Sequence, residues 1–287
     1  ERNKEIEKTC ESDAKEEAEE ILSTNIPLVF SQLELSFGKK EFIGVIECYR
    51  VLISYLHVES IDLSPDFFNS HIPDVIENCL KLNPAEYQGE ASDKCVEVMI
   101  NTMVFIECLF KRNQTNLLKH IISDGFVEAL MYIRQNIQEN SEIAEKFICM
   151  MDAISDTLDE NGYTFIKTIC DPDFFETHIK GTQLAKQYLC HLLFNIASSN
   201  DSYEFHDDLI EVIDIMGKSL GEEDGHAKEH LVRALSKIGA TKFEKTNDDS
   251  MDVWLSEIID RGLLDFSLSL LDSTSASEND AATAFFS

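Results

Sequence analysis

One pattern recurs along the chain about every forty residues, and it constrains the fold more than any other feature. A short apolar segment, often opened by Ile-Pro or by Gly and an apolar residue, precedes a longer amphipathic segment. The short segments are 25–33, 71–80, 124–133, 208–216 and 261–271, with a weaker one at 171–179. The longer segments are 46–56, 96–110, 147–158, 189–199 and 230–240. Pro and Gly at the openers are typical of helix starts or sharp entries.

The longer segments have the apolar spacing of helices. Leu231, Leu235 and Ile238 fall on one helical face, and Leu192 and Ile196 are expected to face the core in the same way. The 287 residues include only 11 Gly and 5 Pro, too few turn signals for a β-sandwich. One helical unit of this size cannot bury its apolar face alone, so neighbouring units must stack. The sequence therefore predicts an all-α solenoid.

Several phrases resemble armadillo repeats, with HEAT repeats next in similarity. LLKHIISDGFVEALMYI (117–133) and WLSEIIDRGLLDFSLSLL (254–271) resemble the second armadillo helix with its Gly turn. LLFNIASSN (192–200) and ALSKIGA (234–240) resemble the end of the third helix. The resemblance implies a right-handed α-solenoid of about five to six repeats over residues 21–287. Residues 1–20 are then an acidic lead-in or a capping helix, and we expect the chain to be a fragment of a longer protein.

The resemblance also implies a binding surface. Armadillo proteins of the importin-alpha and beta-catenin types hold extended peptides with an Asn on each third helix, whose amide both donates and accepts. Aligned on Asn195, the longer segments give Ser54, Asn101, Asp156, Asn195 and Lys237, in steps of 47, 55, 39 and 42 residues. One turn earlier stand Arg50, Glu97, Asp152, His191 and Arg233. Two of the five positions keep the Asn, and the importin-type Trp is not retained.

These positions, called the ladder below, are the predicted partner-binding site. The predicted groove residues are Glu97, Asn101, Asp152, Asp156, His191, Asn195, Arg233 and Lys237. The net charge of −30, from 54 acidic and 24 basic side chains, repels phosphate backbones and attracts basic partners. We therefore expect a protein partner, a basic peptide or helix, and no nucleic acid. In the alternative interpretation these charges form only a solvated surface.

One string has the pattern of a catalytic motif. His226-Ala-Lys-Glu229-His230 fits H-x-x-E-H, which resembles the zinc site of inverzincin peptidases. The third ligand of that family lies far downstream, and little chain remains here, so we expect surface histidines beside acidic residues. Glycine-rich nucleotide motifs and the G-x-S-x-G motif do not occur. We predict no catalytic residues, no metal and no cofactor.

The cysteines bear on location. Eight cysteines occur without a C-x-x-C pair, mostly among apolar neighbours, which is typical of reduced core thiols in an intracellular protein. No apolar stretch approaches eighteen residues, so we expect no membrane association. The sequence predicts a cytoplasmic or nuclear scaffold or adaptor without enzymatic activity. A regulator or exchange factor for a chaperone or small GTPase is the alternative, and a zinc peptidase is the third hypothesis.

Overall fold

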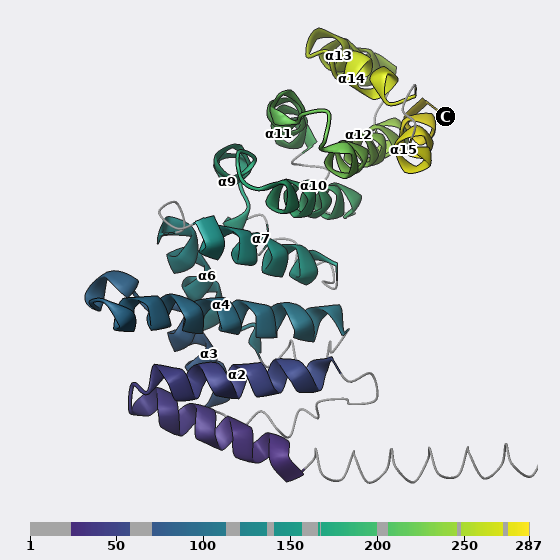
Figure 1. Cartoon of the computed structure of the whole chain (residues 1–287). Helices are drawn as coiled ribbons and strands as arrows, with labels where there is room; N and C mark the ends of the chain where they lie inside the picture. Colours follow the sequence, from purple (N-terminus) through teal and green to yellow (C-terminus); the bar gives the residue numbers. More distant parts are fainter. Residues whose placement is uncertain are drawn as a thin grey trace, which may run out of the picture. The chain divides into compact units, whose positions relative to one another are not determined.

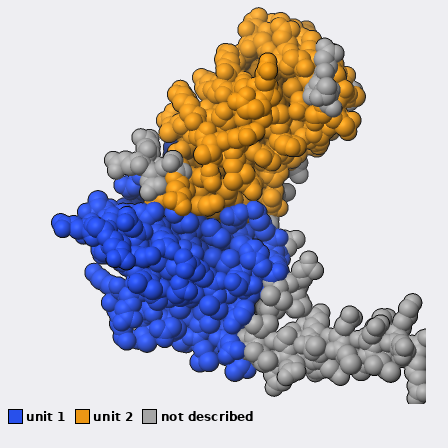
Figure 2. Space-filling view, viewed as in Figure 1, with its two compact units in different colours: residues 1–137 blue, residues 138–287 orange. Residues whose placement is uncertain are grey.

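The computed structural model describes residues 24–57, 71–112, 121–136, 141–156, 166, 168–199, 206–245, 248–271 and 275–286. These residues are mostly helical and contain no strand. The predicted lead-in at residues 1–20 lies outside them. The chain divides into two compact units, residues 1–137 and 138–287, which Figure 2 shows in different colours. The expectation of one repeat domain from residue 21 to residue 287 stays a prediction.

Unit 1 is a series of helices of different lengths (Figure 1). Residues 24–38 are helical, and they are followed by α2 (Phe42–Leu56), α3 (Ile72–Leu80), the 3₁₀ turn η2 (Pro84–Glu86), α4 (Glu90–Lys111) and α6 (Asp124–Asn136). The long helices α2 and α4 pack along each other, and α3 packs against both α4 and α6. Each repeat of the sequence pattern thus contributes one helix to each of two neighbouring layers. One layer contains α2 and α4, and the other contains α3 and α6.

Unit 2 repeats this arrangement. Its helices are α7 (Ser141–Ser155), α9 (Pro172–His178), α10 (Gln183–Ser198), α11 (His206–Ser219), α12 (Gly225–Lys245), α13 (Asp248–Asp260), α14 (Leu263–Ser269) and α15 (Ala276–Phe286). The helices α7, α10, α12 and α15 pack in that order, and α9 packs against α11. This order is the stacking that a forty-residue helical period predicts.

The helix starts have local causes. Pro73 and Pro172 stand in the first turns of α3 and α9, where a missing N–H costs nothing. Asp171 caps α9 by accepting a hydrogen bond from the Phe174 amide at 3.0 Å. Thr182 caps α10 in the same way, accepting from the Ala185 amide at 3.2 Å. Gly262 has φ +73°, a conformation that favours glycine, and it separates α13 from α14.

The predicted segments coincide with these helices. The longer ones lie in α2, α4, α7, α10 and α12, although residues 157 and 158 of the third are outside the described residues. The shorter ones lie in the helix at 24–38 and in α3, α6, α9, α11 and α14. Leu192 and Ile196 are buried, as their spacing predicts. No predicted segment corresponds to α15, whose buried Ala281 and Ala282 give a weak apolar signal.

The cysteines in the described part of the chain form no disulfide, and most are buried. Burial raises the pKa of the Cys79 thiol to about 12 and that of Cys95 to about 11. Both thiols are therefore protonated and unreactive at neutral pH. Among the described helices, none has the length and apolar character needed to cross a bilayer.

Candidate functional site

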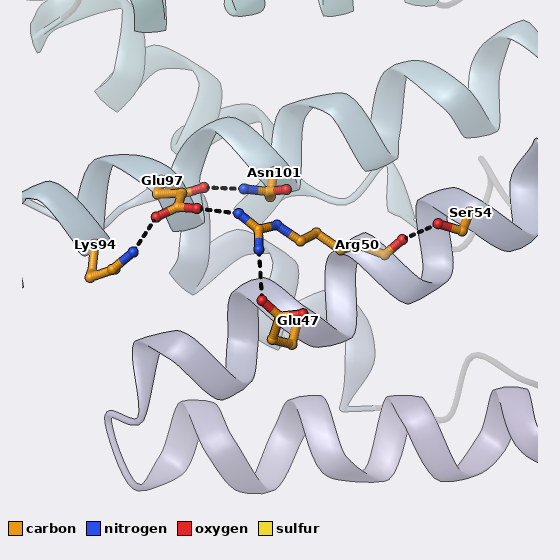
Figure 3. A network of polar contacts seen from close by, with 6 residues as sticks. All are labelled: Glu47, Arg50, Ser54, Lys94, Glu97 and Asn101. Carbon is orange, nitrogen blue, oxygen red and sulfur yellow. Dashed lines mark hydrogen bonds and ion pairs between the residues drawn. The ribbon is translucent and has the colours of Figure 1, made fainter.

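In unit 1 the ladder side chains of α2 and α4 bond to one another (Figure 3). Arg50 donates from Nη2 to Glu97 Oε1 at 2.7 Å, across the two helices. Its Nη1 donates to Glu47 on α2, also at 2.7 Å. Lys94 donates to the other carboxylate oxygen of Glu97 at 2.8 Å. Glu97 is thus neutralised by two cations, in a surface network in which the Arg50 side chain is 54% exposed.

The two neighbouring ladder residues in this unit bond to their own helices. Asn101 donates from Nδ2 to the Glu97 carbonyl at 2.7 Å, and Ser54 donates to the Arg50 carbonyl at 2.8 Å (Figure 3). The first of these bonds uses one of the two Nδ2 hydrogens of the Asn101 amide. The structure therefore brings the side chains of Arg50 and Glu97 together, whereas Asn101 and Ser54 each bond within their own helix.

In unit 2 the predicted residues of α7 and α10 gather into one cluster. His191 Nδ1 lies 2.8 Å from Asp152 Oδ1. Asn195 donates from Nδ2 to Asp156 Oδ1 at 2.7 Å and to Ser155 Oγ at 2.8 Å. The Asp152 side chain is only 4% exposed, whereas that of Asp156 is 47% exposed. The hydrogen bond to Asp152 raises the pKa of His191 above its usual value, against the opposing effect of burial.

The helix α12 contacts this cluster through His230, which is not among the predicted groove residues. The His230 ring lies 4.7 Å from the His191 ring, centroid to centroid. Burial and the neighbouring His191 lower the pKa of His230 to about 4, so this ring is neutral at pH 7. Its buried Nδ1 has no hydrogen-bond partner among the described residues. The repeated step of 39 residues from Asp152 to His191 to His230 is the sequence signal that identifies it.

The predicted residues of α12 itself lie apart from these contacts. Arg233 pairs with Glu229 on its own helix at 2.8 Å, and Lys237 is exposed. Their role in a groove stays a prediction.

The H-x-x-E-H string has a structural environment of its own. Glu229 accepts from Arg233, and the His226 ring is largely exposed, with its Nδ1 3.8 Å from Glu229 Oε2. In the described part of the chain, the group with metal-ligand spacing is instead Asp152, Asp156 and His191, whose atoms lie within 4.8 Å of one another. Each of these three already has a protein partner. Chemically, the cluster is a hydrogen-bonded connection between α7 and α10.

Comparisons with known proteins bear on the fold. No protein-family model matches the sequence, and no curated protein is significantly similar to it. Solved structures do match. A designed armadillo repeat protein aligns at TM-score 0.63 with 14% identity, covering 91% of this chain and 98% of its own. Two other engineered proteins align at TM-scores of 0.63 and 0.64, with 16% and 15% identity, over 91% of this chain and 94% and 96% of theirs.

At these identities the likeness shows the fold alone. It covers nearly all of the chain, and the matched structures include a repeat protein of the predicted kind. The all-α solenoid class is confirmed, and the chain has an armadillo-like helical-repeat fold.

Proposed function

We propose that the chain is a non-catalytic protein-binding scaffold that holds a basic peptide or helix against the ladder side chains of its long helices. The observation that carries this proposal is the half-exposed carboxylate of Asp156, beside His191 and Asn195, in a chain of net charge −30. A Lys or Arg side chain can pair with this carboxylate at little desolvation cost. The surrounding field steers a basic partner toward it.

The contacts and burial of each ladder residue indicate its expected role. Asp152 is buried and bonded to His191, so its role is to hold α7 against α10. Asp156 is the expected contact for a basic side chain. The Asn195 amide already donates to two protein acceptors and the Asn101 amide to one, so a partner gains least from donation by Asn195.

The test uses a fluorescent ten-residue peptide of alternating Lys and Ser, which has no apolar side chain. We expect it to bind the full chain weakly, with an affinity that falls as salt rises. Asp156→Lys should weaken binding about fivefold, since it replaces a pairing group with a repelling one. Asp208→Lys is the matched control, because Asp208 is exposed on α11, a shorter helix outside the ladder.

Fluorescence polarisation across a salt series measures both affinities, and circular dichroism checks that each variant is folded. Equal weakening by the two substitutions would reduce the effect to net charge and contradict the proposal. Charge reversal at Asp152 is a poor test, because a buried Lys beside His191 would disturb folding.

The proposed setting is the cytoplasm or nucleus. Its support is the set of cysteines in the described residues that form no disulfide, distributed over both units. A partner protein in the same compartment is the expected ligand, and the charge of the chain argues against nucleic acid.

A further inference from the structure

A pocket opens in unit 2, away from the ladder contacts of α7 and α10. It has a volume of about 550 Å³, and α12, α13, α14 and α15 all contribute to its lining. From α12 come Ser236, Gly239 and Ala240, whose small side chains leave the space between the helices unfilled. Volumes of this size are typical of sites that bury a drug-sized group or several side chains.

One wall of the pocket is fixed by a close approach. Trp254 on α13 is buried and presses its ring edge on Gly239. A Cβ atom at position 239 would lie 2.8 Å from Cη2 of the indole, closer than packed carbons come. Glycine is therefore needed at 239, and the ring is held in place as part of the pocket lining.

The rim of the pocket is apolar and exposed. Phe243 at the end of α12 is 74% exposed, and Ile259 on α13 is 58% exposed. Leu255 and Phe286 are also exposed. On α13 the residues Trp254 and Ile258 face inward, while Leu255 and Ile259, one position further along, remain outside. Exposed apolar side chains gathered around a pocket mark an interaction site.

Acidic side chains adjoin this rim. Asp252 precedes Leu255 by three positions and Ile259 by seven, so the three share one face of α13. Asp260 is exposed at the end of the same helix. The described α13 side chains include no Lys or Arg. On the α13 side, a group that fills the pocket therefore meets apolar walls beside carboxylates, while Lys237 and Lys242 stand next to pocket-lining residues of α12.

We propose that this pocket binds the apolar face of a basic amphipathic helix, with Leu-like side chains entering between α12 and α13 and Lys or Arg flanking them. The carboxylates at Asp252 and Asp260 disfavour an acidic ligand such as a fatty acid. The net charge of −30 disfavours a second copy of the chain. The proposal stands apart from the proposed function, because it uses the pocket between α12, α13, α14 and α15 and depends on apolar contacts.

The single tryptophan of the chain lies in the pocket, which supplies the readout. The probe is an eighteen-residue helix of Leu and Lys, free of aromatic residues, with Leu at helical positions i, i+3, i+4 and i+7. Titration into the full chain should give a saturable change in Trp254 fluorescence. The double variant Leu255→Gln/Ile259→Gln should weaken binding about tenfold, since it removes two apolar anchors.

Two further variants keep this result interpretable. Ala240→Phe should fill the pocket and weaken binding by a similar factor while leaving helical content unchanged. The matched control is Leu28→Gln/Ile43→Gln in unit 1, where both side chains are more exposed than Leu255 and Ile259. We expect the control to change affinity less than about twofold. Trp254 lies in the pocket and not at the ladder, so its fluorescence separates this proposal from the proposed function.

Alternative occupants are outcomes of the same series. The same helix with Glu in place of Lys should bind at least about tenfold more weakly than the basic helix. Absence of a saturable signal with the basic helix, or equal affinity for both helices, overturns the proposal. Tighter binding of a fluorescent fatty acid overturns it as well. So does a dimer, detected by sedimentation, that the Leu255/Ile259 variant dissociates.

Discussion

The two units connect their long helices by different chemistry at corresponding ladder positions. Between α2 and α4 the connection is the Arg50–Glu97 ion pair, which lies at the surface. Between α7 and α10 it is the pair of contacts Asp152–His191 and Asp156–Asn195, of which the first is largely buried. An exposed pair exchanges partners with water at little cost, whereas a buried carboxylate depends on its partner.

This contrast teaches where polar groups stabilise stacked helices. The same fold tolerates an interchangeable surface network in one place and requires a specific hydrogen-bonded cluster in another. The substitutions below test that contrast, in order of decreasing effect.

The largest effect is expected from His191→Ala. It leaves the buried Asp152 carboxylate without its imidazole partner and removes the contact with the His230 ring. We expect the free energy of unfolding to fall by about 3 kcal/mol. Denaturant unfolding at pH 7 measures the loss, and hydrogen exchange should locate it in α7 and α10. A loss below that of Arg50→Ala would contradict the contrast.

The second prediction concerns pH. The pKa of His230 is about 4 in the folded chain and about 6.5 when unfolded, so the unfolded state binds the proton first as pH falls. As pH falls, stability starts to decrease near the pKa of His230 in the unfolded state. The decrease is complete near the pKa of His230 in the folded state. Between pH 7 and pH 5 the expected loss is about 2 kcal/mol. His230→Gln should remove this component.

The pKa of His191 is shifted in the opposite direction to that of His230. The native chain must therefore be compared with the His230→Gln variant. Its raised folded pKa gives stability that is present below the unfolded pKa and is lost as pH rises through the folded value. Both effects are present in the native chain, so the informative quantity is the difference in pH dependence between it and His230→Gln. Identical pH dependence in the two proteins would refute the role given to His230.

A smaller effect is expected from Asn195→Ala. Asn195 is mostly buried, and its amide bridges Ser155 and Asp156 on the neighbouring helix. Removing it should cost about 1–2 kcal/mol. Asn101→Ala is the comparison, because among the described residues the Asn101 amide bonds to its own helix, through the Glu97 carbonyl. If unfolding curves give equal losses for the two, the distinction between bridging and local amides fails.

The smallest effect is expected from Arg50→Ala. The Arg50 side chain is exposed, and Lys94 continues to pair with Glu97 after the change. The expected loss is about 0.5 kcal/mol at low salt, and it should vanish at high salt. A loss that persists in 1 M salt would indicate packing of the Arg50 stem.

The fold followed from the sequence to a large extent, because each repeat carries its own helical spacing and its own Pro or Gly opener. Leu192 and Ile196 are core residues for that reason. The helix α15 escaped prediction because alanines bury little apolar area and show little periodicity. Trp254 could be assigned to a helix core from sequence, but its contact with Gly239 depends on how α12 meets α13.

The ladder shows the limit for site residues. The spacing placed Asp152 and His191 on facing long helices, and the structure brings them together. The burial of Asp152 could not be read from the sequence, because it depends on the distance between α7 and α10. On α12 the ladder residue predicted from the apolar pattern is Arg233, whereas the residue that contacts α10 is His230. Helix registry between neighbours is set by side-chain packing along the whole length of the pair.

The rate at which a buried thiol is chemically modified can report how often the unit around it opens. Cys79 and Cys95 lie in unit 1 and Cys190 in unit 2, all free and protonated at neutral pH because burial raises their pKa values. A thiol reagent therefore reacts with each only when the surrounding helices separate. Rates of modification at individual cysteines would report how often either half of the chain loosens while the other stays folded.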